Sequence, residues 1–471
     1  MRRRSVRLNA LGFAVSLKLD AGRSELTAAV NAYVAELARR KCVGLFYYAG
    51  HGVQLAWRNY MLPVDADIDT IGDIQKQAVE VNSLLAGIGK ADNALNVIIL
   101  DACRDNPFGS LKGLDQKGLS QMDAPASTLL AYATSPGNVA SDGTGANGLY
   151  TEHLLREIRI PDTHVEDVFK RVRLGVRRAS NSAQIPWECT SLEEDFYFLP
   201  PKSVREPSEI ERDRRFEKEL VLWQKVQGAT APEPLVDFLR RYPSGAFAEL
   251  AQLQIDRVLA TLGEKRIRIA SQEGNPYSAG SAEADTRWRV GDSYTYARTD
   301  LFEGKTMRNT MQTVTEVTAS EVQYSDGMVT DLLGNVLRRS GGRVYTPNQL
   351  EPLDYAVGKQ WVTQYRITTH KGITGRNEME LRIVKREQIT VPAGTFNAFR
   401  IEGRGVFEEE GGRVEITTLK KWVAPDRLRR EVAMEETRER SGRGNSRRPE
   451  RGGGLRVTQS LRWELVSFKQ A

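Results

Sequence analysis

Cysteine and histidine are both scarce in this chain. Its 471 residues include three cysteines, Cys42, Cys103 and Cys189, and four histidines. An odd number of widely spaced cysteines argues against a disulfide scaffold, and the lack of closely spaced Cys and His pairs argues against a structural zinc site. Any chemistry that needs one Cys and one His therefore has few candidate pairs.

The sequence also lacks a long apolar run and a strong excess of one charge. No apolar stretch reaches the roughly 18 residues of a membrane-spanning helix, so no membrane span is expected. A net charge of +6 from 67 basic and 61 acidic residues is too small for this length to favour nucleic-acid binding.

The first residues combine a basic start with a short apolar run. This resembles a signal peptide, but Lys18 and Asp20 interrupt the run, so none is predicted. The location stays open: the sequence as given indicates the cytoplasm, and a signal peptide upstream of it would place the protein in the periplasm.

Residues 1–200 alternate apolar runs with amphipathic helical patterns. The periodicity predicts strands at 12–17, 43–49, 96–102 and 129–134, and helices at 24–38, 78–88 and 165–178. Ser24 is the expected N-cap of the first helix. Fully apolar strands separated by helices indicate a mostly parallel sheet with helices on both faces. An α/β fold is therefore predicted for this part.

The remaining chain changes character twice. Residues 201–275 predict a helical linker with one hairpin of the tetratricopeptide type. Residues 286–471 show alternating runs separated by Gly-rich turns, which predicts an antiparallel β domain, either a sandwich or an open barrel. Within it, residues 438–454 are basic and of low complexity; a disordered hairpin loop is expected, and an arm for nucleic acid or an anionic surface is the alternative.

Two of the apolar strands end in chemically distinctive residues. One leads into Tyr48-Ala-Gly-His-Gly52, and the other into Asp101-Ala-Cys-Arg-Asp105. Because neighbouring parallel strands present their carboxyl ends at the same edge of a sheet, His51 and Cys103 are expected to face each other there.

These motifs resemble those of caspase-like cysteine peptidases of the bacterial metacaspase (orthocaspase) group, which is related to paracaspases. Further similar segments are Asn59-Tyr-Met-Leu-Pro-Val-Asp, Ala131-Tyr-Ala-Thr-Ser-Pro-Gly and Gln184-Ile-Pro-Trp-Glu. The resemblance covers residues 10–200 and implies a caspase-like three-layer α/β/α sandwich. In that family an apolar strand and a helix usually come first, so this domain is expected to lack its first strand.

The resemblance implies a cysteine-type endopeptidase with a Cys–His dyad. Cys103 would be the nucleophile and His51 its acid–base partner, and the backbone N–H groups of Gly52 and Cys103 would form the oxyanion hole. Taken alone, His51 reads as an ordinary turn histidine and Cys103 as a buried core thiol. Their joint occurrence with this spacing favours the dyad.

Asp101 is the expected selector of substrate. Its carboxylate would attract Arg or Lys and repel Asp, so cleavage after Arg or Lys is predicted, with Arg preferred because it can pair bidentately. The alternative for Asp101 is a structural hydrogen-bonding role. Lys112 and Lys117, in the polar segment after Cys103, are candidate self-cleavage sites.

No metal motif is present. Calcium is implied only by the resemblance, because Asp65, Asp67, Asp69 and Asp73 lack the Gly and terminal Glu of an EF-hand loop. His153 and His164 lack the spacing of a metal site. The expected partners are protein or peptide substrates, with a protein or cell-envelope component for the β domain. The main alternative function is a catalytically inactive caspase-like scaffold or protein-binding module.

Overall fold

The computed structural model describes residues 8–103, 111, 118–135, 147–201, 208–264, 274–307, 309–409, 413–441 and 455–470. The chain folds into two compact units: one comprises Met1–Pro207 and Asp256–Gly280, and the other comprises Ser208–Ile255 and Ser281–Ala471. The helical segment 201–275 is thus divided between the two units.

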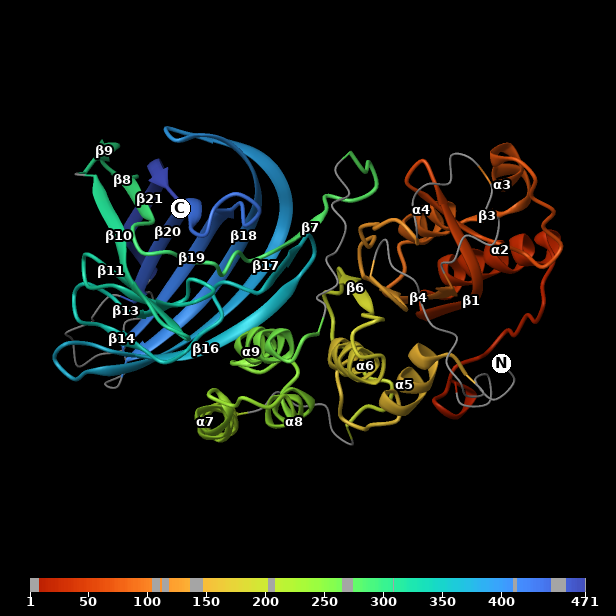
Figure 1. The fold of residues 1–471 in the computed structure, drawn as a ribbon, viewed down its shortest axis with the longest axis horizontal. Helices are drawn as coiled ribbons and strands as arrows, with labels where there is room; N and C mark the ends of the chain where they lie inside the picture. Colours follow the sequence, from red (N-terminus) through yellow and green to blue (C-terminus); the bar gives the residue numbers. More distant parts are fainter. Residues whose placement is uncertain are drawn as a thin grey trace. The chain divides into compact units, whose positions relative to one another are not determined.

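The first unit is built on a mixed sheet with the strand order β3-β2-β1-β4-β5-β6 (Figure 1). Strands β1, β4 and β5 run parallel, while β2, β3 and β6 are antiparallel to their neighbours. The strands are β1 (Val43–Leu55), β2 (Arg58–Met61), β3 (Val79–Glu80), β4 (Leu95–Cys103), β5 (Thr128–Tyr132) and β6 (Trp187–Thr190).

Helices cover both faces of this sheet. On one face, apolar residues of α2 and α4 pack against Ile98, Leu100 and Leu130; on the other, those of α5 and α6 pack against Val97 and Ile99. This alternation along β4 is what a strand buried on both faces requires. The helices are α2 (Arg23–Arg40), α3 (Ile71–Gln77), α4 (Val81–Ala91), α5 (Leu149–Glu157) and α6 (Val165–Ala179).

Three expectations for this unit were wrong. The sheet is mixed and not mostly parallel, because β1 turns back into β2 through Ala56 and Trp57, which both have positive φ, 49° and 66°. Residues 12–17 form no strand. Helix α2 begins at Arg23, so its N-cap is Gly22 and not Ser24.

A segment from late in the chain, residues 274–280, belongs to this first unit. The Ser278 hydroxyl and the Ala279 N–H donate to the carboxylate of Asp123, at 2.7 and 2.9 Å. Asn275 donates to the Gln121 carbonyl at 2.7 Å. Burial raises the pKa of Asp123, and the hydrogen bonds from Ser278 and Ala279 oppose that rise. We call residues 274–280 the strap.

The second unit is an antiparallel sheet that closes on itself, because β8 pairs with β10 (Figure 1). The predicted antiparallel β region is present, but it is a closed barrel, not an open one or a sandwich. Along the order β10-β11-β12-β13-β14-β16-β17-β18-β19-β20-β21-β8, its strands are β8 (Ser293–Asp300), β10 (Thr310–Val317), β11 (Glu321–Tyr324), β12 (Val329–Asp331), β13 (Val336–Arg338), β14 (Val344–Tyr345), β16 (Gln360–Thr368), β17 (Thr374–Val391), β18 (Gly394–Glu409), β19 (Arg413–Val423), β20 (Glu431–Ser441) and β21 (Leu455–Lys469), and β9 (Lys305–Thr306) pairs with β8. Outside it, β7 (Ser281–Glu283) pairs with β15 (Asp354–Ala356).

Helical residues pack against this closed sheet. The helices of this segment are α7 (Glu209–Val226), α8 (Glu233–Arg241) and α9 (Ala248–Thr261). Glu249 pairs with Lys359 at 2.9 Å, and the buried Gln349 side chain bridges the Gly245 carbonyl and the Glu249 N–H, at 2.6 and 3.0 Å. The predicted hairpin therefore packs on a neighbour.

Two further sequence expectations concern the basic stretch at residues 438–454 and the absence of a membrane span. Most of the basic stretch, residues 442–454, lies outside the described residues, whereas 438–441 form the end of β20. Within the described residues, no helix is long and apolar enough to cross a membrane.

Replacing Gln349 should loosen this helical segment. Gln349→Ala leaves the Gly245 carbonyl and the Glu249 N–H without their partner, and each such buried group costs about 1–3 kcal/mol. Hydrogen exchange of residues 245–255 is expected to accelerate accordingly. Gln388→Ala, at an exposed position of β17, is the matched control and should leave exchange unchanged; equal exchange in both variants would contradict this view of the packing.

Candidate active site

The two strands that carry the predicted dyad are neighbours in the sheet. Strand β1 pairs with β4 in parallel, and the last registered pairs are Ala49 with Asp101, Gly50 with Ala102 and His51 with Cys103. Adjacent strands lie about 4.8 Å apart, so the backbone of His51 is directly beside that of Cys103. The His51 side chain is exposed.

The orientation of the His51–Gly52 peptide is fixed from one side. The carbonyl oxygen of His51 accepts from the Leu62 N–H at 3.0 Å and from the Tyr48 hydroxyl at 2.7 Å. Leu62 directly follows β2, so this carbonyl points toward β2. Because a trans peptide directs its C=O and N–H in opposite directions, the N–H of Gly52 points toward β4, where Cys103 lies.

Gly52 also sits where no side chain would fit without movement. A Cβ there would lie 3.1 Å from Ala102 Cβ and 3.1 Å from Leu119 Cδ2, which is closer than ordinary contact between carbon atoms. The absence of a side chain therefore lets β1 approach the carboxyl end of β4 closely.

Asp101 is held by hydroxyl groups from two other elements. Its Oδ2 accepts from the Tyr47 hydroxyl of β1 at 2.8 Å and from the Thr151 hydroxyl of α5, and these two hydroxyl oxygens lie 2.6 Å apart. Asp101 is half-buried. The carboxylate is thus anchored on the face of the sheet that α5 covers, beside the registered His51 and Cys103 pair.

Leu119 and Ser120 lie beside the site. Lys112 and Lys117, the candidate self-cleavage positions, lie outside the described residues, as do Arg104 and Asp105. The fully buried Asn59 of β2 exchanges two hydrogen bonds with the backbone of Ser120, at 2.7 and 2.8 Å. This fixes the segment that carries Leu119 against Gly52.

Sequence reasoning did not identify Tyr47, Tyr48, Asn59 or Thr151. Tyr48 and Asn59 stood within motifs that carried the family resemblance, but nothing in the motifs indicates which backbone group each side chain would contact. Thr151 lies far along the chain from the strands it supports, so it gave no local signal.

Several of the residues considered for metal binding have other partners. Among the residues that the structure describes, no group of three or more His, Cys, Asp or Glu side chains could hold a metal ion. Asp65 accepts from the N–H of Arg23 at the start of α2, and Asp73 completes a capping box with Thr70 on α3. His164 contacts Tyr197 at 2.8 Å and Asp195 at 3.3 Å, and His153 contacts Arg156 at 2.8 Å. The calcium that the resemblance implied stays a prediction.

The two other cysteines differ in access to solvent. Cys42 is exposed and Cys189 is buried. Burial raises the pKa of the Cys189 thiol to about 12. Because the thiolate is the reactive form, Cys189 is unsuited to nucleophilic chemistry.

Residues 5–197 match the family model described as "Caspase domain". The chain is also 30% identical over 151 residues to mucosa-associated lymphoid tissue lymphoma translocation protein 1 of Homo sapiens, and to the same extent to the homolog in Mus musculus. Each match covers 31% of this chain and 17% of the relative. The chain thus spans about a sixth of the length of these curated relatives.

Cys42 and Cys189 should differ in their rate of alkylation in the native protein. Iodoacetamide at mildly alkaline pH is expected to modify Cys42 and leave Cys189 untouched, because a thiol with a pKa of about 12 is almost entirely protonated there. Peptide mass spectrometry gives the modified fraction at each cysteine. Protein unfolded in urea is the control, in which Cys189 must react. Modification of Cys189 in the native protein at the rate of Cys42 would contradict its burial.

Proposed function

Since residues 5–197 belong to the caspase family of domains, we propose that this chain is a cysteine-type endopeptidase with Cys103 as nucleophile and His51 as acid–base partner. The observation that carries the proposal is the register of β1 with β4, which ends with His51 beside Cys103. A second support is that the other described cysteines do not suit the role: Cys189 is buried, and Cys42 lies at the opposite, amino-terminal end of β1 from His51.

The proposed reaction follows from these positions. The Cys103 thiolate attacks the carbonyl carbon of the scissile peptide bond, and the resulting oxyanion accepts hydrogen bonds from the N–H groups of Gly52 and Cys103. Collapse of this intermediate breaks the C–N bond, and His51 protonates the leaving amine. A water molecule that His51 deprotonates then hydrolyses the thioester and restores the thiol. The anchored His51 carbonyl supports this scheme because it directs the Gly52 N–H toward Cys103.

Asp101 is the proposed selector of a basic substrate residue. The two hydroxyl donors hold its carboxylate in one orientation beside the dyad. They also occupy Oδ2, and a carboxylate oxygen accepts about two hydrogen bonds, so only Oδ1 is left for a substrate cation. We therefore propose cleavage after Arg or Lys with only a modest preference between them, since a bidentate Arg contact needs both oxygens.

The decisive experiment uses the full chain and fluorogenic peptides that differ only in the residue before the scissile bond. Peptides with Arg and Lys should be cleaved, and the peptide with Asp should not. Cys103→Ala is expected to abolish cleavage. Asp101→Asn should lower kcat/KM for the Arg and Lys peptides by about tenfold or more, since a hydrogen bond to a charged group contributes about 1.5–3 kcal/mol.

The outcomes separate the competing functions. Cleavage after Asp would overturn the role of Asp101 and keep the dyad. Equal cleavage by the wild type and Cys103→Ala would exclude Cys103 as nucleophile. No cleavage of any peptide by a folded protein would favour an inactive caspase-like scaffold that binds proteins.

Removing the Tyr48 hydroxyl should weaken catalysis without unfolding the domain. Tyr48→Phe deletes one of the two donors to the His51 carbonyl, so kcat is expected to fall by about 3- to 10-fold, as for the loss of one ordinary hydrogen bond, with little change in KM. Tyr33→Phe is the matched control, because the buried Tyr33 hydroxyl has no hydrogen-bond partner among the described residues. Equal kcat values for the two variants would exclude a positioning role for Tyr48.

A further inference from the structure

The apolar core of the second unit does not fill the closed sheet. A cavity of about 470 Å³ lies among the strands, within the range of roughly 300–1,000 Å³ that is typical of small-molecule sites. Closed sheets of many strands can enclose ligand cavities. The chemistry of the wall indicates what kind of molecule this one would hold.

Part of the wall is aromatic and aliphatic. The rings of Tyr345 and Tyr365 lie with their centroids 6.1 Å apart. Phe407, Trp463 and Leu419 also line the cavity. Such walls favour a ligand with an apolar body, which would displace water from them.

The buried carboxylates of the wall already have cationic partners. The ion pairs are Lys421–Glu351, Arg430–Glu431, Arg438–Glu436, Arg438–Glu415 and Arg440–Glu415. Burial disfavours ionisation of Glu431, but Arg430 and Lys421 outweigh it and lower the pKa of that carboxyl to about 2. Because these carboxylates are already paired, a cationic ligand would have to displace an existing partner.

Arg298, Arg339 and Arg343 all line the cavity, and none of them forms an ion pair with a carboxylate that the structure describes. Arg339 lies on the turn between β13 and β14 and is exposed. Burial lowers the pKa of Lys421 to about 8, and the guanidinium groups of Arg430 and Arg339 act in the same direction.

An amide donor lies in the same region. Asn377 is only 4% exposed and lines the cavity, and its Nδ2 has no hydrogen-bond partner among the described residues. In the sheet, Asn377 is paired with Tyr365 of the neighbouring strand. Arg339 acts on Tyr365 as well, where its charge opposes the rise in pKa that burial causes. Asn377 and Tyr365 are thus neighbours across two strands, and both line the same cavity as Arg339.

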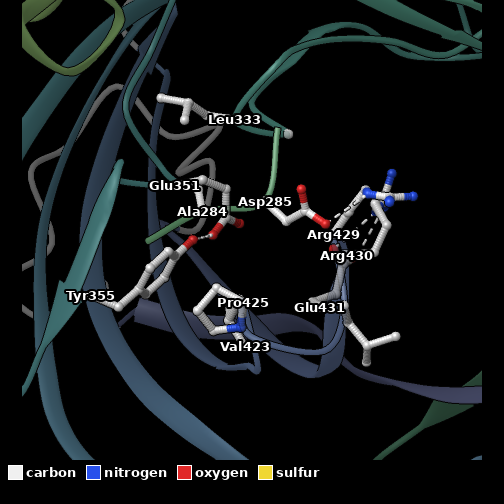
Figure 2. A pocket seen from close by; sticks show the side chains of 12 residues that line it. Ala284, Asp285, Leu333, Glu351, Tyr355, Val423, Pro425, Arg429, Arg430 and Glu431 are labelled. Atoms are coloured by element: carbon white, nitrogen blue, oxygen red, sulfur yellow. Dashed lines mark hydrogen bonds and ion pairs between the residues drawn. The ribbon is translucent and has the colours of Figure 1, made fainter. Parts of the chain in front are cut away.

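Another part of the wall is formed by groups that are paired with one another. A smaller cavity of about 20 Å³, the size of a water site, shares Glu351, Arg430 and Glu431 with the large one. Figure 2 shows the residues that line the smaller cavity: the Tyr355 hydroxyl donates to Glu351 at 3.0 Å, and Arg429 pairs with Asp285 at 3.1 Å. These paired groups are therefore engaged with one another, whereas Arg339 has no such carboxylate partner among the described residues.

We propose that this cavity binds a small amphipathic monoanion, a carboxylate with an apolar body. Its carboxylate lies at Arg339 and Asn377, and its apolar body lies along Tyr345, Tyr365 and Trp463. This binding does not depend on peptidase activity and can be tested separately from it.

The test compares three chain-matched probes by isothermal titration calorimetry on the full chain, below their micellar concentrations. Decanoate carries the proposed head group, 1-decanol is neutral and decylammonium is cationic. Decanoate is expected to bind at one site per chain, and at least fivefold more tightly than either of the others. Equal affinity for all three probes, or no saturable binding of decanoate, would overturn the proposal and leave a solvent-filled space.

Two substitutions test the assigned head-group site. Arg339→Gln is expected to weaken decanoate binding at least fivefold, while Arg338→Gln, at the neighbouring exposed arginine that does not line the cavity, should leave it unchanged. Asn377→Leu should weaken decanoate without affecting 1-decanol, which separates loss of the amide donor from a change in cavity shape. If Arg338→Gln weakens binding as much as Arg339→Gln, the attraction is general surface charge and the site is wrong.

Discussion

The parallel pairing of β1 with β4 determines what the carboxyl edge of the first unit can do. It begins with Val43 beside Leu95 and ends with His51 beside Cys103. A shift of one residue would move every side chain of β1 to the opposite face of the sheet. The register is specified because both faces are buried, and because Gly44 lets α2 approach β1: a Cβ there would lie 2.6 Å from Leu37 Cδ2. Helix packing far from the edge therefore sets which residue of β1 lies next to Cys103.

The parts of the fold that could be predicted are those with a local signal. The runs that became β1, β4 and β5 are apolar because both faces are covered, and their order along the chain predicted parallel neighbours. The β1–β2 hairpin gave no such signal, because its turn uses Ala56 and Trp57 at positive φ, where Asn and Gly are usual. Residues 12–17 have strand composition, but composition alone provides no neighbouring strand to pair with.

The candidate site, too, could be predicted only in part. The motifs around His51 and Cys103 were visible because each follows an apolar run. The hydroxyls that hold Asp101 and the His51 carbonyl were not, because a tyrosine or threonine in a sequence does not indicate which distant group it will contact. In the second unit, alternation predicted strands correctly. The alternation could not show that some of the charged side chains face the interior of the closed sheet. Interior charges that pair with one another, such as Lys421 and Glu351, produce the same alternation of polar and apolar residues as charges that face solvent.

The strap gives the first unit a boundary that does not coincide with the family match. Asp123 is largely buried and receives two of its hydrogen bonds from Ser278 and Ala279, while Arg177 of α6 pairs with Asp256 at 2.6 Å and Glu264 at 3.1 Å. A fragment that ended at residue 201 would lose all of these partners, leaving a carboxylate and a guanidinium in sites shaped for their counterparts. Such a fragment would be less stable than the same residues within the whole chain. Adding residues 256–280 as a separate peptide should restore part of that stability, so the domain is discontinuous in sequence.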